Sequence, residues 1–174
     1  MTADMPEQTR AGILRHPSVT RVRDALAAVQ VTPEIVVLDG AARTAAQAAA
    51  YLGVLPAQIA NSLVFAAFPE GGGSPEPVLV LASGAHRVDT TKVADILELD
   101  TLEMASADLV REATGFVIGG VAPVGHTIAI RTFVDVSLAR YDTVWAAAGH
   151  THAVFATTYD ELLRITAGHP VEAT

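Results

Sequence analysis

The chain has 174 residues, a formal net charge of −8, 51% hydrophobic residues and no cysteine. This length and apolar content predict one globular domain with a sizeable core and exclude a disordered chain. Without cysteine there are no disulfides, thiolate catalysis or cysteine-based zinc sites, and the negative charge argues against strong nonspecific binding to nucleic acid. No apolar run reaches the roughly 20 residues of a membrane span, and residues 1–10 lack a signal-peptide pattern, so we expect a cytoplasmic protein.

Short segments with helical and strand patterns follow one another between two expected tails, residues 1–15 and 169–174. The N-terminal tail is expected to be flexible because it is polar and lacks apolar periodicity. Elsewhere, apolar residues at helical spacing predict helices, and short apolar runs predict strands. Helices are expected from residue 18, over 45–52, from 90 or 91 to 97, over 106–114 and from 158, and strands over 34–38, 61–68, 78–82, 101–104, 117–118, 128–133, 144–148 and 153–156.

The beginnings of these helices have recognisable capping residues. Ser18, Thr44 and Ser106 are expected N-caps, and Thr158 with Glu161 forms a capping-box pattern. The elements lack regular β-α-β alternation, and no internal repeat or linker divides them. We therefore expect residues 16–168 to form a single α+β domain, with a mixed, mainly antiparallel twisted sheet flanked by helices.

The segment Phe116–His126 is rich in glycine, and its glycines bracket Pro123. Glycine adopts positive φ and lets another group approach the backbone closely, whereas proline fixes φ and removes one N–H. Successive amides in such a loop form a nest that binds a carboxylate, phosphate or carbonyl oxygen. From the spacing alone, a long, tight β-turn without a ligand explains the segment equally well.

Polar residues near this loop have two interpretations each. Asn61 and Ser62 lie at the start of a strand that is predicted to be buried, where polar groups need hydrogen bonds. They either brace a neighbouring loop or line a cleft beside the glycine-rich segment. His126 is either a general acid or base or a hydrogen-bond brace, and the adjacent Gly125 favours the brace.

Two further groups have weaker patterns. His150 and His152 place two imidazoles on one strand face, but no third metal ligand has a matching spacing, so loop or surface histidines are favoured. Ser83, His86 and Asp89 are the residue types of a hydrolase triad, yet they lie too close in sequence and no Gly-x-Ser-x-Gly motif occurs. Asp89 is instead expected to cap or brace the turn before the next helix.

Taken together, four segments resemble the YbaK/prolyl-tRNA synthetase-associated editing-domain family. They are residues 58–65, 80–89, 114–126 and 148–150, in the expected order. The similarity extends from about His16 to Gly168, and the glycine-rich segment is its most specific part. It implies that the chain has the editing-domain fold.

Known members of this family hydrolyse the ester of mischarged aminoacyl-tRNA, commonly prolyl-tRNA that carries alanine or cysteine. The resemblance implies a trans-acting deacylase that serves translation fidelity, takes the aminoacyl 3′ end of tRNA as its substrate, and has an aminoacyl-tRNA synthetase or other translation protein as a further partner. It implies no cofactor, metal or membrane. A water, assisted by the ribose hydroxyl of the substrate, would attack the carbonyl, and backbone N–H groups would stabilise the oxyanion by about 3 kcal/mol per donor.

The resemblance also implies which residues form the site. The catalytic candidates are Asn61, Gly119, Gly120 and His126. The substrate-binding candidates are Ser62, Gly84, His86, Pro123, Gly125, Gly149 and His150. Gly119, Gly120 and Pro123 would form the backbone cradle for the aminoacyl carbonyl.

One position departs from the family pattern. Many active members carry a lysine where this chain has Asn61, in a segment similar to Ile-x-Lys-Thr-Leu. Asparagine keeps hydrogen bonding but loses the charge, Lys92 and Arg87 are not expected to reach the site, and Arg43 is interpreted as a solvated surface charge. The alternative function is therefore a noncatalytic family member that binds a small aminoacyl-type ligand or a partner protein.

Overall fold

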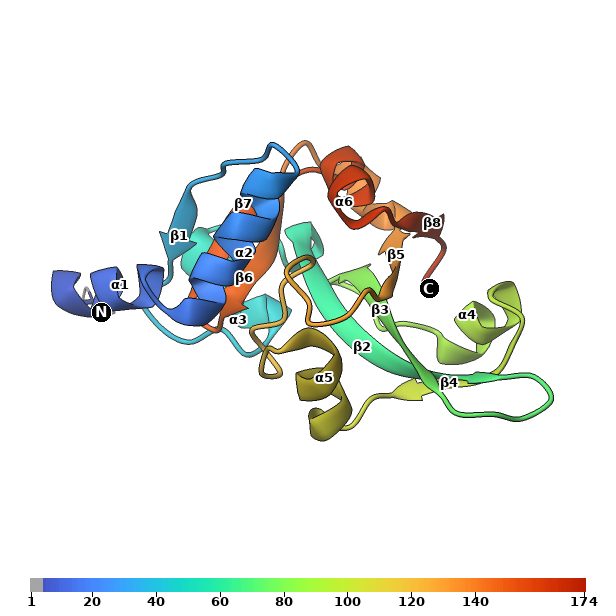
Figure 1. Ribbon diagram of the computed structural model, residues 1–174. Coiled ribbons are helices and arrows are strands. Elements are labelled where there is room, and N and C mark those ends of the chain that lie inside the picture. The colour runs from blue at the N-terminus through green and yellow to red at the C-terminus, as the bar shows by residue number, and fades with distance from the viewer. Residues whose placement is uncertain (1–4) are drawn as a thin grey trace.

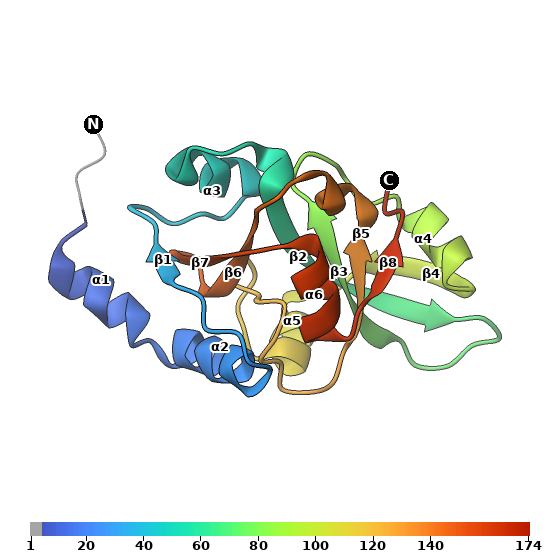
Figure 2. The same cartoon turned by 90° about the horizontal axis from the view of Figure 1, so that it is seen from above.

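A computed structural model describes residues 5–174, and its framework is an eight-stranded sheet (Figures 1 and 2). The strand order is β1-β7-β6-β2-β3-β5-β8, with β4 paired to β2. The strands are β1 (Ile35–Val37), β2 (Ile59–Pro69), β3 (Glu76–Ser83), β4 (Leu99–Met104), β5 (Arg131–Asp135), β6 (Val144–His150), β7 (Ala153–Thr157) and β8 (His169–Val171). The helices are α1 (Glu7–Leu14), α2 (Pro17–Ala28), α3 (Ala45–Leu52), α4 (Thr90–Ile96), α5 (Ala107–Thr114) and α6 (Tyr159–Thr166), with short 3-10 helices η1 (Pro56–Gln58) and η2 (Val136–Arg140).

The long β2–β3 hairpin is the centre of the sheet, as the two apolar runs predict. Its antiparallel register pairs Asn61 with Ala82 and Phe65 with Val78. The other antiparallel pairs are β1–β7, β2–β4 and β6–β7, and the parallel pairs are β2–β6, β3–β5 and β5–β8. The expected α+β fold with a mixed sheet is therefore confirmed.

Successive side chains of a strand point to opposite faces, and other elements cover each face of this hairpin, so both faces are buried. Val64, Leu79 and Leu81 pack into the larger core with α2, α6 and β7. Phe65 and Val80 pack into a second core with α4 and β8. A strand that is covered on both faces has a continuous apolar run, which explains the uninterrupted segment 78–82.

Helices cover the two faces of the sheet, with α3 on one side and α2, α5 and α6 on the other (Figure 2). Thr44 and Ser106 cap α3 and α5 as expected, by accepting from the N–H groups of Gln47 and Leu109 at 3.2 and 3.1 Å. Asp89 caps α4 by accepting from the Lys92 N–H at 3.0 Å, which confirms its expected role at the turn before this helix. Among residues 5–174, no helix combines the length and hydropathy needed to cross a bilayer.

Two other caps differ in detail from the prediction. His16, not Ser18, is the N-cap of α2: its Nδ1 accepts from the Ser18 N–H at 3.1 Å. Thr158 caps α6 by accepting from the Glu161 N–H at 3.0 Å. The Glu161 carboxylate accepts from the Thr157 hydroxyl at 2.8 Å, so it does not complete the expected capping box through its side chain.

Both segments that were expected to be tails contain regular secondary structure. Residues 7–14 form α1, and the Arg10 guanidinium donates to the Val37 carbonyl at 2.8 Å, which ties the helix to β1. Residues 169–171 form β8, and Ala173 beyond it is fully buried. These segments lack strong periodicity because few of their residues are buried, namely Ile13 at one end and Val171 and Ala173 at the other. Residues 1–4 lie outside the described part of the chain.

Of the two strands expected on either side of the glycine-rich segment, the one at 117–118 is wrong, and the one at 128–133 begins later than expected. Val117 and Ile118 lie in a loop with side chains that are 52% and 63% exposed, and Ile128 is 50% exposed. The next strand begins only at Arg131, and it pairs in parallel with β3. An apolar run in the sequence does not distinguish a buried strand from an apolar loop that borders a cavity.

Candidate active site

The candidate site occupies a gap along one edge of β2. On this edge β6 pairs with Ile59 and Ala60, whereas β4 pairs with residues 65–69. Within residues 5–174, no strand pairs with Asn61–Val64 on this edge. The loop after α5 lies beside the gap instead, and a cavity of about 160 Å³ opens there.

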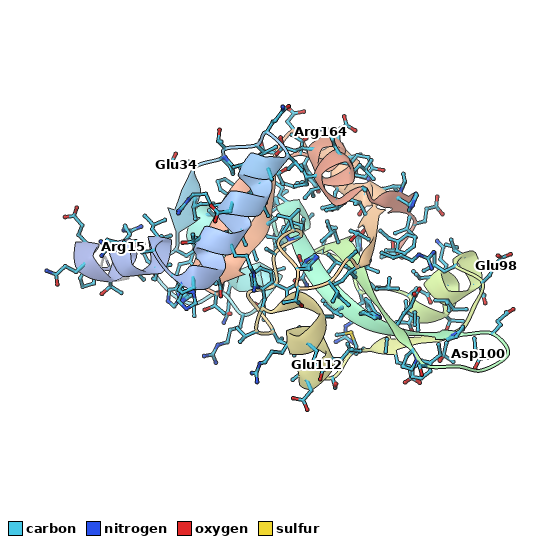
Figure 3. The ribbon with its side chains drawn as sticks, viewed as in Figure 1. Arg15, Glu34, Glu98, Asp100, Glu112 and Arg164 are labelled. Carbon is cyan, nitrogen blue, oxygen red and sulfur yellow. The ribbon has the colours of Figure 1, made fainter. Side chains whose placement is uncertain are left out.

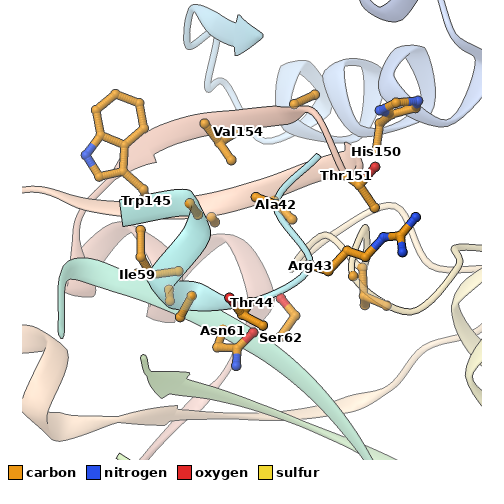
Figure 4. A pocket seen from close by; sticks show the side chains of 18 of the residues that line it. Ala42, Arg43, Thr44, Ile59, Asn61, Ser62, Trp145, His150, Thr151 and Val154 are labelled. Atoms are coloured by element: carbon orange, nitrogen blue, oxygen red, sulfur yellow. The ribbon is translucent and has the colours of Figure 1, made fainter. Parts of the chain in front are cut away.

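The cavity brings together four segments that are far apart in the sequence (Figure 4). They are the turn into α3, the start of β2, the loop after α5 and the β6–β7 hairpin. The polar lining residues are Arg43, Thr44, Asn61, Ser62, His150 and Thr151, and the larger apolar ones are Ile59, Leu63, Ile118, Val121, Trp145 and Val154. A dry cavity of about 150 Å³ holds a molecule of the size of benzene, so this volume suits a small acyl group.

Asn61 and Ser62 line this cavity together with Gly119, so their expected position beside the glycine-rich loop is confirmed. The Ser62 Oγ is buried and has no hydrogen-bond partner among the described residues. A buried unsatisfied hydroxyl costs about 1–3 kcal/mol. The structure therefore gives Ser62 no role in bracing a neighbouring loop and leaves its hydroxyl available to a ligand.

The two adjacent glycines of the loop have different surroundings. Gly119 has φ +91° and lines the cavity, where a Cβ would lie 3.4 Å from Thr151 Cγ2. Gly120 donates its N–H to the Val117 carbonyl at 3.0 Å. A Cβ on Gly120 would lie 3.3 Å from the His150 backbone. The Gly120 amide is thus used inside the protein, and this residue packs the loop against β6 rather than contributing to a nest.

His126, Pro123 and Gly125 lie along a separate open groove and not in the cavity. The His126 Nε2 donates to the Ala122 carbonyl at 2.7 Å, and its ring packs edge-on against Phe116. Burial lowers the pKa of His126, although the hydrogen bond to Ala122 opposes this shift and the positive charge of Arg21 adds to it. This geometry matches the prediction that His126 is a hydrogen-bond brace, and it places the ring outside the cavity.

Three of the other candidate residues lie outside the cavity lining. Gly84 donates its N–H to the Ile59 carbonyl at 2.9 Å, and a Cβ there would come within 2.5 Å of the Pro56 carbonyl. Gly149 has φ +93° and lies against α2. His86 is exposed in the turn before α4. The two glycines allow close packing, which explains them without a ligand.

His150 lies at the rim of the cavity, next to His16 and His152. Burial lowers the pKa of His150, and the neighbouring imidazoles of His16 and His152 lower it further because a second positive charge there is unfavourable. At neutral pH His150 is therefore a neutral hydrogen-bonding group.

Arg43 is a lining residue that the sequence interpretation missed. Its Cα lies close to Gly119, and Figure 4 shows its guanidinium beside Thr151 at the open side of the cavity. Lys92 instead contacts Glu172 and the carbonyl of Thr174. The only signal in the sequence was the place of Arg43 directly before the helix cap Thr44, which is too common to indicate a site.

The comparison with known proteins identifies the class of protein that this fold and cavity define. The pattern of the aminoacyl-tRNA editing domain matches residues 39–165, and the chain belongs to this family. This confirms the resemblance seen in the sequence. Members of the family act on aminoacyl-tRNA, and the family is associated with prolyl-tRNA synthetase.

Similar proteins include both small proteins and parts of ligases. The chain is 32% identical to the uncharacterized protein YwhH of Bacillus subtilis (strain 168) over 129 residues, which are 74% of this chain and 78% of that protein. It is 35% identical to proline–tRNA ligase of Bacillus licheniformis over 109 residues, which are 63% of this chain but only 18% of the ligase. The similarity to the ligase is thus confined to a small part of that enzyme.

Solved structures share the fold over nearly the whole chain. A crystal structure of a proposed trans-editing enzyme for prolyl tRNA synthetase is 38% identical with a TM-score of 0.80, and the match covers 90% of this chain and 96% of that one. The hypothetical protein APE2540 is 27% identical with a TM-score of 0.75, over 86% of this chain and 96% of that one.

Proposed function

We propose that this protein hydrolyses the ester of a mischarged aminoacyl-tRNA in trans. The observation that carries the proposal is the cavity of about 160 Å³ in which Asn61, Ser62 and Gly119 meet in a chain of the editing-domain family. Its volume suits a small aminoacyl group, and it opens at a rim where the nucleoside would lie. The tRNA 3′ end is the proposed partner, and the cytoplasm is the proposed location.

The chemistry needs only donors and a water. The acyl carbonyl lies beside Gly119, and the backbone N–H groups of Gly119 and Val121 are the proposed donors to its oxygen, because the Gly120 N–H already binds Val117. Water attacks the carbonyl carbon, the bond to the ribose oxygen breaks, and the proton of the water passes to the leaving ribose oxygen with help from the adjacent ribose hydroxyl. Donors that are already oriented stabilise the developing oxyanion without reorganisation.

Arg43 supplies the positive charge that Asn61 lacks. It lines the same cavity from a different segment, so the cationic function of the usual lysine is moved from β2 to the turn before α3. Asn61 then acts as a neutral hydrogen-bonding group toward the acyl group. This arrangement favours catalysis over the noncatalytic alternative that Asn61 suggested.

The test is deacylation of a panel of correctly and incorrectly charged tRNAs by the purified protein. We expect turnover of one mischarged species, and we expect Arg43→Ala to lower kcat/KM by at least tenfold, a factor that corresponds to about 1.4 kcal/mol. Arg87→Ala removes an exposed arginine outside the cavity lining and should leave kcat/KM unchanged. Binding of aminoacyl-tRNA without turnover of any species would establish the noncatalytic alternative instead.

A further inference from the structure

A cluster of three histidines lies where α2, β6 and β7 meet, and only one of them lines the cavity. The ring centroids of His16 and His150 are 5.1 Å apart, and those of His150 and His152 are 5.3 Å apart. His150 belongs to the cavity wall, whereas His16 precedes α2 and lies outside the lining. The cluster therefore extends from the mouth of the cavity toward solvent.

The hydrogen bonds of His16 and His150 determine what these rings offer to a ligand. The Nδ1 of His16 accepts from the Ser18 N–H at 3.1 Å, and the Nδ1 of His150 accepts from the His152 N–H at 3.1 Å. A neutral imidazole that accepts at one nitrogen carries its proton at the other, so each Nε2 is a donor. The two rings thus offer N–H groups to an oxygen and lack the free Nε2 lone pair that a metal requires.

The same conclusion follows from the residue types around the cluster. Across residues 5–174, no group of three or more His, Cys, Asp or Glu side chains is arranged to hold a metal ion. Asp39 follows Leu38, whose N–H donates to the His152 carbonyl at 2.7 Å, and the Asp39 carboxylate is already paired with Arg10 at 3.1 Å. No described carboxylate thus completes a cation site here.

Positive charge is available on the adjoining segments. The Ala42 N–H donates to the Thr151 carbonyl at 2.9 Å, which holds the turn that carries Arg43 against the β6–β7 hairpin. Arg15 directly precedes His16 at the α1–α2 junction; Figure 3 shows Glu34 at the same end of the molecule as Arg15, and Glu98 and Asp100 at the opposite end. This rim is therefore suited to an anion even though the chain as a whole is acidic.

We propose that His16, His150 and Arg43 form a phosphodiester-binding subsite that holds the phosphate on the 5′ side of the terminal nucleoside. The inference rests on the proposed function, because it places the acyl ester in the cavity. In an aminoacylated nucleotide the ester and the 5′ phosphate lie on opposite sides of one ribose. A subsite that begins at the wall of the cavity and continues outward has the matching arrangement. Two N–H donors and a guanidinium are groups that bind phosphate oxygens strongly.

The test compares two small esters that differ only in this phosphate. One is a 3′-aminoacyl adenosine, and the other is the same compound with a 5′ methyl phosphodiester, whose single charge does not change with pH. We expect the wild type to have a kcat/KM at least tenfold higher for the phosphodiester, mainly through KM. His16→Asn keeps a capping oxygen for α2 but removes the Nε2 donor, so its ratio between the two esters should fall toward one. His169→Asn, on the exposed edge strand β8, is the matched control and should keep the wild-type ratio.

Equal rates for both esters in the wild type would overturn the subsite while leaving the deacylase proposal intact. A second readout does not depend on turnover. Adenosine 5′-(methyl phosphate) should shift the imidazole NMR resonances of His16 and His150, and adenosine alone should not. If neither ester is hydrolysed but these shifts occur, the subsite is supported and the deacylase proposal fails. Absence of the shifts overturns the subsite.

Discussion

Ser62 places a buried hydroxyl without a described partner in a wall that is otherwise mostly apolar. In the free protein this group contributes unfavourably to stability, so its presence is best explained by what it binds. The hydroxyl is unfavourable for stability but useful for binding a ligand, so replacing Ser62 should change stability and activity in opposite directions.

We expect Ser62→Ala to raise the free energy of unfolding by about 1 kcal/mol, because it removes an unsatisfied polar group. The same variant should have a lower kcat/KM for its aminoacyl ester, because the substrate loses a hydrogen-bonding partner. Denaturant unfolding and deacylation measured on one preparation test both halves. A variant that is less stable than the wild type would show that the hydroxyl has a partner inside the protein.

His126 makes the stability of the protein depend on pH. Its folded-state pKa lies below the usual value of about 6.5, chiefly because the ring is buried. Between these two values the unfolded chain binds more protons than the folded protein, so the free energy of unfolding falls as pH decreases below about 6.5. The total loss is about 1.4 kcal/mol for each unit by which the pKa is lowered.

His126→Gln should remove this loss, because an amide N–H can still donate to the Ala122 carbonyl but does not titrate. Urea unfolding from pH 7.5 to 5 measures the difference. His169→Gln is the control and should retain the pH dependence of the wild type. Identical pH profiles for His126→Gln and the wild type would show that His126 does not cause the loss of stability at low pH.

The contact between α2 and β6 depends on the absence of a side chain at Gly149. A Cβ there would lie 2.6 Å from the Ser18 carbonyl oxygen, and the residue has φ +93°. Because α2 also carries His16, this contact holds the proposed phosphate subsite together as well as the core. Gly149 is thus a structural residue that affects the site through the position of a helix.

Gly149→Ala should destabilise the protein by roughly 2–4 kcal/mol, which combines backbone strain of about 1–2 kcal/mol with the cost of moving α2. Gly71→Ala provides the matched control, because Gly71 has φ +83° but nothing within 4 Å of an added Cβ. The Gly71→Ala variant should be destabilised only by the backbone strain of about 1–2 kcal/mol. Equal losses in thermal or denaturant unfolding would show that α2 does not press on Gly149.

The proposed function requires an acidic protein to bind a polyanion. The net charge of −8 argues against broad electrostatic attraction to tRNA, so the proposed recognition relies on a few local contacts near the acyl end. The proposed subsite supplies one phosphate contact. Each such contact on a single strand contributes a slope of about −0.7 to the dependence of log K on log salt concentration.

We therefore expect the affinity for an aminoacyl-tRNA to fall only about threefold between 50 and 200 mM salt. Filter binding or fluorescence titration with a catalytically slow substrate analogue measures this slope. A decrease of a hundredfold or more would mean that an extended basic surface docks the tRNA, which would contradict this mode of recognition.

Much of the local structure was predictable from the amino-acid sequence. The caps at Thr44 and Ser106 were predictable because each depends on residues three positions apart. The strands of the β2–β3 hairpin were predictable because two apolar runs flank a turn that is rich in glycine and proline. The family, and with it the general fold, was also predictable from the order of four short segments.

The site, in contrast, depends on long-range contacts in the tertiary structure. The pairing of β2 with β6 joins residues more than 80 positions apart and leaves the gap at Asn61–Val64 where the cavity forms. Only this arrangement places Gly119 in the cavity lining and His126 in a separate groove. It also brings Arg43 to the cavity and His16 next to His150. Such contacts depend on the closure of long loops and the packing of whole elements, and neither leaves a periodic pattern in the sequence.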